Sequence, residues 1–473
     1  MVFDEVFAPF IDESPVSVMF RGTLEAAFSS ERLDRIFEEM AERQYCGELA
    51  FSTCAELLSL VVTRIQPSVH AAYRKNRSDI SVSVRSIYNK LAGIEPAVSE
   101  SLVRETAADL KPVIEAMDAT LPGPLPGYEL RIVDGNHLSG TQHRLKELRA
   151  IGDAPLPGHT VAVLNPHVEL VEDLIICRDG HANQKPLYIQ LLDQVRRGQC
   201  WIADRDYSTL DFLSGIAQRK AYFVIRQHGV LKGQPVGRRR RVGRIDTGVV
   251  YEQGLRLTTA EGEEITVRRV TLKLDEPTRD GDTELHLLTN LPKKVSASKI
   301  AKAYASRWQI ETAFAKLTTV LKCELNTLGY PEAALFGFCL AVMMYNAISV
   351  VLAALRATHP EVVTPSTRTG TAKKKITFSF YYLADEISGV ARGMAIAIPT
   401  QYWTNAFAKP TPKQLAKKLL WLASRVKVEE FLTNPYGPQQ RRKRRKMTTR
   451  GGNVSTHRIL QKRKQPAGKN VHG

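Results

Sequence analysis

The sequence predicts an α/β protein in which a mixed β-sheet lies between helical regions. Residues 1–125 show helical periodicity, and short β-rich runs separated by turn residues begin at residue 128. These runs then alternate with helical segments, as in a mixed α/β layer. With 473 residues and 43% apolar content, the chain can bury a substantial core and divide into two or three domains, which excludes a disordered protein.

Residues 1–125 are predicted to form a helical, DNA-binding region. SSERLDRIFEEM begins with serines and places apolar residues on one face, and TCAELLSLVV opens with an expected capping box of Thr53 and Glu56. The basic stretch YRKNRSDISVSVRSIYNKL predicts short helices around a serine-rich turn. This stretch is either a helix-turn-helix-like DNA reader or a pair of solvated helix faces.

Residues 126–228 are predicted to form the first part of the sheet. YELRIVDGNHL, HTVAVLNPHVEL and VEDLIICRD are typical of an antiparallel meander. PLYIQLLDQV and STLDFLSGIAQRK favour helices, and CWIAD and AYFVIRQ favour strands. Residues 229–292 lack helix signals and are predicted to be a β-rich insertion. Its segment GRRRRVGR is either a solvated basic hairpin or an arm that contacts phosphates.

The remaining chain is predicted to be helical and then basic. Residues 293–357 complete the core with a long helix and an apolar helix, residues 358–436 form a C-terminal helical region, and residues 437–473 form a disordered basic tail. The apolar run LFGFCLAVMMYNAISVVLAAL is long enough to span a bilayer. Because it contains Asn346 and Ser349 and no second span exists, we expect a buried core helix and no membrane partner.

The charge and cysteine patterns narrow the function. A net charge of +17 favours a polyanionic partner, and no acidic residue follows Glu430 while 12 lysines and arginines do. The six cysteines form no CxxC pair, so neither a zinc module nor a disulfide framework is indicated.

Three acids occupy positions from which they can meet. Asp134 lies in the first predicted strand, Asp204 ends the fourth, and Glu311 lies on the long helix. Sites in open sheets form at carboxyl strand ends, although an Asp after a strand is often only the cap of the next helix. Asp206 or Ser208 is an alternative cap. Clustered carboxylates suit Mg²⁺, and two such ions can support phosphodiester displacement.

The long helix carries a polar stripe beside an apolar one. At 100° per residue, Tyr304, Arg307, Glu311, Thr318 and Lys322 align, and the apolar stripe is expected to pack on the sheet. An exposed Arg307–Glu311 pair would add only a few tenths of a kcal/mol to helix stability. We therefore expect these two residues to have separate tasks rather than to form a stabilising ion pair.

The motifs IVDGNHL, WIADRDYS, LLTNLP and YASRWQIETAF, taken in this order, resemble the DDE-type transposases of bacterial insertion sequences. Among these transposases, the chain most resembles the group that has a Tyr-Arg-Glu-Lys signature and a β-rich insertion before the catalytic Glu. The resemblance implies an RNase H-like fold and a cytoplasmic, nucleoid-associated enzyme that uses Mg²⁺, with Mn²⁺ as a substitute. It also implies double-stranded DNA partners, namely terminal inverted repeats and target DNA, and a homodimer on paired ends.

By the same resemblance, Asp134, Asp204 and Glu311 are the catalytic, metal-binding acids, and Tyr304 and Arg307 contact DNA. The signature lysine would fall at Thr318, so Lys322 is expected to replace it as a phosphate contact. The basic tail should bind phosphates without sequence preference. Its densest run comprises Arg441, Arg442, Lys443, Arg444, Arg445 and Lys446.

The expected activity is cleavage of the element ends and joining of the 3′-OH ends to target DNA. Two alternatives share the same sequence features. One is a sequence-specific DNA nuclease on the same fold, and the other is a catalytically inactive relative that only binds DNA.

Overall fold

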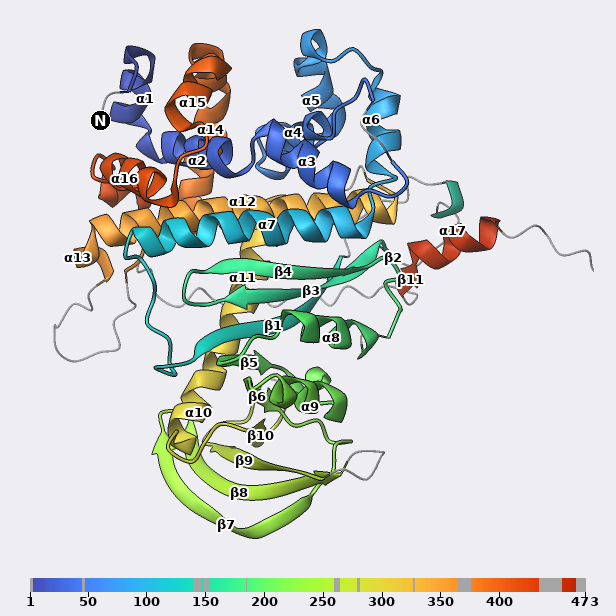
Figure 1. Ribbon diagram of the computed structural model, residues 1–473, viewed down its shortest axis with the longest axis vertical. Helices are drawn as coiled ribbons and strands as arrows, with labels where there is room; N and C mark the ends of the chain where they lie inside the picture. Colours follow the sequence, from blue (N-terminus) through green and yellow to red (C-terminus); the bar gives the residue numbers. More distant parts are fainter. Residues whose placement is uncertain are drawn as a thin grey trace, which may run out of the picture.

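The computed structural model describes residues 3–44, 47–138, 146–148, 154–183, 185–258, 264–278, 281–325, 328–363, 376–433 and 453–464. Its centre is a nine-stranded mixed sheet within these residues (Figure 1). In spatial order the strands are β4 (Leu170–Cys177), β3 (Gly158–Asn165), β1 (Glu129–Leu138), β5 (Gln199–Ala203), β6 (Tyr222–Arg226), β10 (Glu284–Thr289), β9 (Glu264–Leu274), β8 (Gly248–Thr258) and β7 (Gln234–Ile245).

The strand directions divide this sheet into three parts. β4, β3 and β1 are antiparallel neighbours, which confirms the predicted meander. β1, β5 and β6 run parallel to one another, and β10 then pairs antiparallel with β6. The parallel part is the one that brings several carboxyl strand ends to a single edge.

Each face of the sheet packs against its own helices, because alternate strand residues point to opposite sides. On one face, Val133, Trp201 and Phe223 pack with α8 (Lys185–Leu191) and α9 (Leu210–Gln218). On the other face, Ile132 and Ile202 join the large core that includes α11 (Trp308–Thr319).

The helices of both chain ends gather around one central helix, α12 (Pro331–Thr358) (Figure 1). They are α1 (Ala8–Glu13), α2 (Pro15–Ala27), α3 (Ser30–Met40), α4 (Phe51–Val62), α5 (Val69–Lys75), α6 (Val84–Leu91), α7 (Pro96–Ala116), α13 (Pro360–Val363), α14 (Phe380–Ala397), α15 (Thr400–Phe407) and α16 (Pro412–Ala423). The expected capping box is wrong: α4 already begins at Phe51, after Ala50, so Thr53 lies inside the helix.

Helix α12 is the apolar segment that is long enough to cross a membrane, and it is buried along its length. Its one amide side chain, Asn346, is fully buried. Asn346 Oδ1 accepts from the Val171 N–H and its Nδ2 donates to the Val171 carbonyl, both at 2.9 Å. Here α12 is the buried core helix expected from its polar residues, and it satisfies the backbone of edge strand β4.

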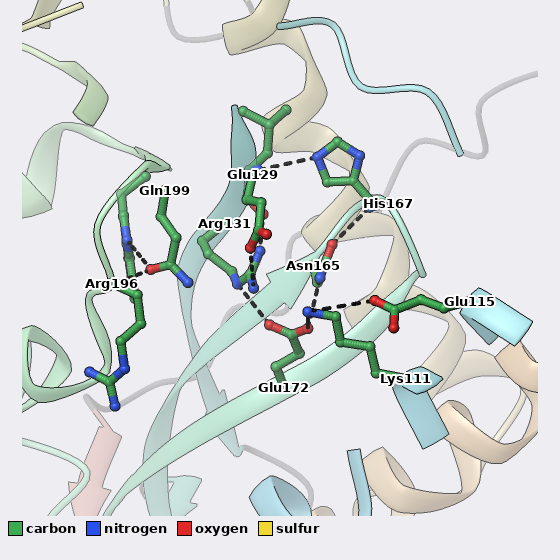
Figure 2. A network of polar contacts seen from close by, with 11 residues as sticks. Lys111, Glu115, Glu129, Arg131, Asn165, His167, Glu172, Arg196 and Gln199 are labelled. Atoms are coloured by element: carbon green, nitrogen blue, oxygen red, sulfur yellow. Dashed lines mark hydrogen bonds and ion pairs between the residues drawn. The ribbon is translucent and has the colours of Figure 1, made fainter. Parts of the chain in front are cut away.

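A second set of polar contacts fixes the start of β1 (Figure 2). The buried Arg131 places Nε 2.7 Å from Glu172 Oε2 on β4, and Glu172 Oε1 accepts from Asn165 at 2.7 Å. Lys111 of α7 lies 3.9 Å from the same Glu172 oxygen. Because a buried charge needs close partners, these contacts hold β1 to β4 and α7 only three residues before Asp134.

The predicted β-rich insertion is present, as strands β7 to β10, but it extends the central sheet rather than forming a sheet of its own. GRRRRVGR lies on β7, the outer edge strand, and is almost entirely exposed. Arg239 pairs with Glu284 at 2.8 Å, and its guanidinium carbon lies 4.3 Å from the centre of the Tyr251 ring. The segment is therefore a basic strand paired with β8, and its contact with phosphates stays a prediction.

The C-terminal tail contains regular structure, contrary to the expectation of disorder throughout residues 437–473. β11 (Asn453–Ser455) pairs in parallel with β2 (Ala154–Leu156), and α17 (Thr456–Lys464) follows it. Arg458 Nε donates to Asp179 Oδ2 at 2.6 Å. The Arg458–Asp179 ion pair and the pairing of β11 with β2 explain the regular structure of this segment. Amino-acid composition alone did not predict it.

Candidate active site

The pairing of β1 with β5 places the two candidate aspartates side by side. Val133 is in register with Ala203 on these parallel strands, so Asp134 and Asp204 follow at matching positions. Neighbouring strands are about 4.8 Å apart. By strand alternation both residues are on the same side as Ile132 and Ile202, which pack in the core with α11.

The third acid reaches this edge from a helix that packs against β1. α10 (Ala297–Tyr304) is followed by a single 3-10 turn, Ala305–Arg307, and then by α11. Ile310 and Leu317 of α11 are fully buried, as the apolar stripe predicted. Their burial places Glu311 at the rim of the sheet, close to the aspartates.

Arg307 joins two of the acids directly. Its Nη1 lies 2.9 Å from Asp134 Oδ2 and its Nη2 lies 2.5 Å from Glu311 Oε1. The expectation that Arg307 and Glu311 would not pair is therefore wrong. The pair is not the exposed one considered from sequence, because Arg307 is only 9% exposed and also contacts a residue 173 positions away.

Burial and mutual repulsion set the electrostatics of the cluster. Burial raises the pKa of Asp134 to about 6; Arg307 and the Gly135 N–H oppose this shift, while Asp204 and Glu311 add to it. Burial, with the nearby Asp204, also raises the pKa of the Tyr304 phenol. The acids, Tyr304 and Arg307 thus lie within electrostatic reach of one another.

Asp204 has a local role as well as its place beside Asp134. Its Oδ1 accepts from the Arg205 N–H at 2.6 Å, at the start of a short 3-10 helix, Arg205–Tyr207. The cap of α9 is Thr209, whose hydroxyl accepts from Phe212 N. Neither Asp206 nor Ser208 takes that position, so Asp204 is free of the α9 cap role.

The chemistry of the three acids suits a hard divalent cation, but their arrangement here does not. Carboxylate oxygens are the ligands that Mg²⁺ prefers. In the part of the chain that the structure describes, no group of three or more His, Cys, Asp or Glu side chains is placed to hold a metal ion. The guanidinium of Arg307 contacts two of the three carboxylates.

Comparison with known proteins identifies the segment that contains this cluster. Residues 125–347 match the family model described as Transposase DDE domain, and this range includes all three acids. This segment is similar to a transposase DDE domain. The resemblance to insertion-sequence transposases read from the motifs is thereby confirmed.

Curated proteins that are similar to this chain also have transposase names. The chain is 32% identical over 171 residues to a putative transposase, y4zB, of Sinorhizobium fredii, covering 35% of this chain and 46% of that protein. It is 24% identical over 272 residues to the putative transposase InsL for IS186A of Escherichia coli and to the transposase for IS421, covering 49% of this chain and 69% of each relative. The chain thus spans less than half of the first of these relatives.

Lys322 does not lie on the helix stripe that was predicted to contain it. α11 ends at Thr319, so the stripe does not continue one turn further. Lys322 Nζ instead donates to the Pro67 carbonyl at 2.8 Å, and Thr318 Oγ1 donates to Phe314 O. The geometric basis for a lysine substitute is therefore wrong. The predicted tail contacts, Arg441 to Lys446, lie outside the described residues.

One residue near the acids, Arg226, was missed from sequence. Arg226 ends β6 and donates to Asp282 Oδ2 at 2.7 Å, and its charge influences Tyr304. The strand-end rule that selected Asp204 would also have selected Arg226. Trp308, next to Arg307 in sequence, is 63% exposed, and the Arg307 guanidinium carbon lies 5.5 Å from the centre of its ring.

His137, close to Asp134 in sequence, belongs to a different group. It lies opposite His159 on β3, with ring centroids 5.2 Å apart. Burial lowers the pKa of His159 to about 4, so this ring is neutral at physiological pH. By strand alternation the pair is on the side of Val133, away from the carboxylates. This placement separates His137 from the acid cluster.

Proposed function

We propose that the chain is a DNA transposase that cleaves the ends of an insertion sequence and joins the 3′-OH ends to target DNA. The observation that supports this most strongly is the register of β1 and β5. It aligns Asp134 with Asp204 inside the segment that matches the Transposase DDE domain, beside Glu311.

Both proposed steps are phosphoryl transfers, in which an oxygen nucleophile forms a bond to phosphorus as the leaving oxygen departs. Such reactions depend on positioning and charge neutralisation more than on a protein nucleophile. A bound divalent ion, Mg²⁺ or Mn²⁺, would supply a Lewis acid for this chemistry. Asp134, Asp204 and Glu311 are the residues proposed to hold it.

The basic side chains are proposed to hold DNA. Arg307 and Tyr304 border the acids and are suited to a phosphate near the cleaved bond. Lys322, the Arg441–Lys446 run and the exposed arginines of β7 are proposed to contact the backbone farther away, with salt-dependent affinity. The helical N-terminal region is proposed to recognise the terminal repeats, and two copies of the chain are proposed to act on paired ends in the cytoplasm.

The test is incubation of the purified full chain with DNA from both flanks of its coding region, Mg²⁺ and a target plasmid. The wild type should give covalently joined products, and Asp134→Ala should bind the same DNA without cutting it. Cleavage without joined products would favour the nuclease alternative. Binding by the wild type without any cleavage would overturn the enzymatic proposal and favour an inactive relative.

A further inference from the structure

The contacts of Arg307 connect two carboxylates that come from distant parts of the fold. Asp134 directly follows the buried residues Leu130–Val133 on β1, and Glu311 lies one turn along α11 from Arg307. The two guanidinium nitrogens Nη1 and Nη2 each take one acid, at 2.9 and 2.5 Å. A single cation from within the protein therefore contacts both acids.

The remaining surroundings of Arg307 differ from those of an arginine fixed for structure alone. Its Nε is buried and, within the described residues, has no hydrogen-bond partner. By contrast, Arg268 of β9 uses Nε and both terminal nitrogens on Glu252, Leu291 and Val295. A buried donor without a partner is costly, so Arg307 is held mainly by the acids.

The backbone at Arg307 is also a point where the helix geometry changes. Arg307 ends the 3-10 turn that separates α10 from α11. Short 3-10 stretches between helices commonly mark hinges. On its outer side the guanidinium faces the exposed ring of Trp308 rather than a packed core.

We propose that Arg307 is an internal counter-cation that keeps Asp134 and Glu311 in a metal-excluding arrangement until its guanidinium is withdrawn. The inference rests on the proposed function in one respect, that these acids are metal ligands. An arginine fork binds a phosphate as readily as a carboxylate, so a DNA phosphate is the chemical group that matches the withdrawn side chain. Binding of DNA and of the divalent ion is then coupled, and the coupling is reciprocal.

A simple clamp role for Arg307 predicts the opposite behaviour. A clamp would hold the two acids together for the ion, and its removal would weaken metal binding. A counter-cation competes with the ion for the same oxygens, so its removal strengthens metal binding in the absence of DNA. The sign of one affinity change therefore separates the two roles.

The experiment is titration of the DNA-free full chain with Mn²⁺, with free Mn²⁺ measured by electron paramagnetic resonance. Arg307→Gln should bind Mn²⁺ at least about tenfold more tightly than the wild type, since two charge-assisted bonds no longer compete. Arg226→Gln is the matched control. It removes the same charge from the same edge but from Asp282, not from the acids, and should change the affinity much less.

Equal or weaker Mn²⁺ binding by Arg307→Gln would overturn the inference while leaving the proposed metal site intact. If neither protein binds Mn²⁺ in a manner that Asp134→Asn abolishes, the metal part of the proposed function fails instead. Arg307→Lys serves if the glutamine variant does not fold. A single ammonium matches the two acids less well than the guanidinium fork. The Mn²⁺ affinity of Arg307→Lys should therefore be higher than that of the wild type and Arg226→Gln, but lower than that expected once no cation competes for the acids. An Mn²⁺ affinity equal to that of the wild type would count against competition.

Discussion

Replacement of Asn346 by leucine should destabilise the protein although it makes α12 more apolar. Asn346 is fully buried, and its amide satisfies both the N–H and the C=O of Val171 at 2.9 Å. Hydrophobicity alone predicts the opposite sign, because leucine is the better residue for an apolar interior. The outcome thus depends on whether the backbone of an edge strand needs these partners.

The magnitude follows from the two bonds that are lost. Leaving a buried donor or acceptor without a partner costs about 1 to 3 kcal/mol for each group. Burying the larger apolar side chain returns up to about 2 kcal/mol. At the middle of that range the two groups together cost about 4 kcal/mol, so after the apolar return the free energy of unfolding should fall by about 2 to 4 kcal/mol.

Urea unfolding followed by circular dichroism measures this change. Met344→Leu is a suitable control, because it is a volume-conserving swap at a buried position on the same helix and should cost less than about 1.5 kcal/mol. A leucine variant at position 346 that is as stable as the wild type would refute the reasoning, since Val171 would then not depend on α12.

Three further predictions follow from buried or paired charges. Burial raises the pKa of Glu386 from 4.5 to about 7, so the stability that its protonated carboxyl contributes is fully present below pH 4.5 and is lost as pH rises through 7. Glu386→Gln should therefore stabilise the chain by up to about 3 kcal/mol at pH 8 and not at pH 4.5, as measured by unfolding at both pH values. Glu172→Ala leaves the buried Arg131 without its closest partner and should lower the free energy of unfolding by about 3 to 5 kcal/mol, whereas Glu172→Gln should lower it less. Asp179→Arg should release the C-terminal segment to limited proteolysis, and adding Arg458→Asp should restore protection.

Each of these has a clear contrary result. An equal effect of Glu386→Gln at both pH values would show that the carboxyl is not buried as described. Equal losses for the two Glu172 variants would assign the effect to shape rather than charge. Unchanged protection in Asp179→Arg would show that strand pairing, not the ion pair, holds the segment.

Local patterns predicted most of the fold because each element buries its own face. The meander of β1, β3 and β4 follows from alternation, and two of the buried positions of α11, Ile310 and Leu317, follow from helical spacing. The carboxyl-edge rule led to Asp134 and Asp204, and the β1–β5 register aligns them. Their catalytic roles stay predictions.

The features missed from sequence depend on contacts between distant segments. The end of α11 at Thr319 places Lys322 against Pro67 of the N-terminal region, which no helical count contains. The Arg307–Asp134 contact joins a helix to a strand 173 residues away. Order in the tail likewise comes from the Arg458–Asp179 pair rather than from tail composition.

The central position of α12 has a consequence for the fate of damaged gene copies. Its partners are divided between segments made before it, α2, α4 and α7, and segments made after it, α14 and α16. A stop codon shortly after residue 358 would release a chain whose 28-residue apolar helix has lost the cover that α14 and α16 provide. Such a chain would expose a large apolar surface and aggregate. Truncated copies should therefore disappear from the soluble pool instead of persisting as fragments that bind DNA and compete with the intact protein.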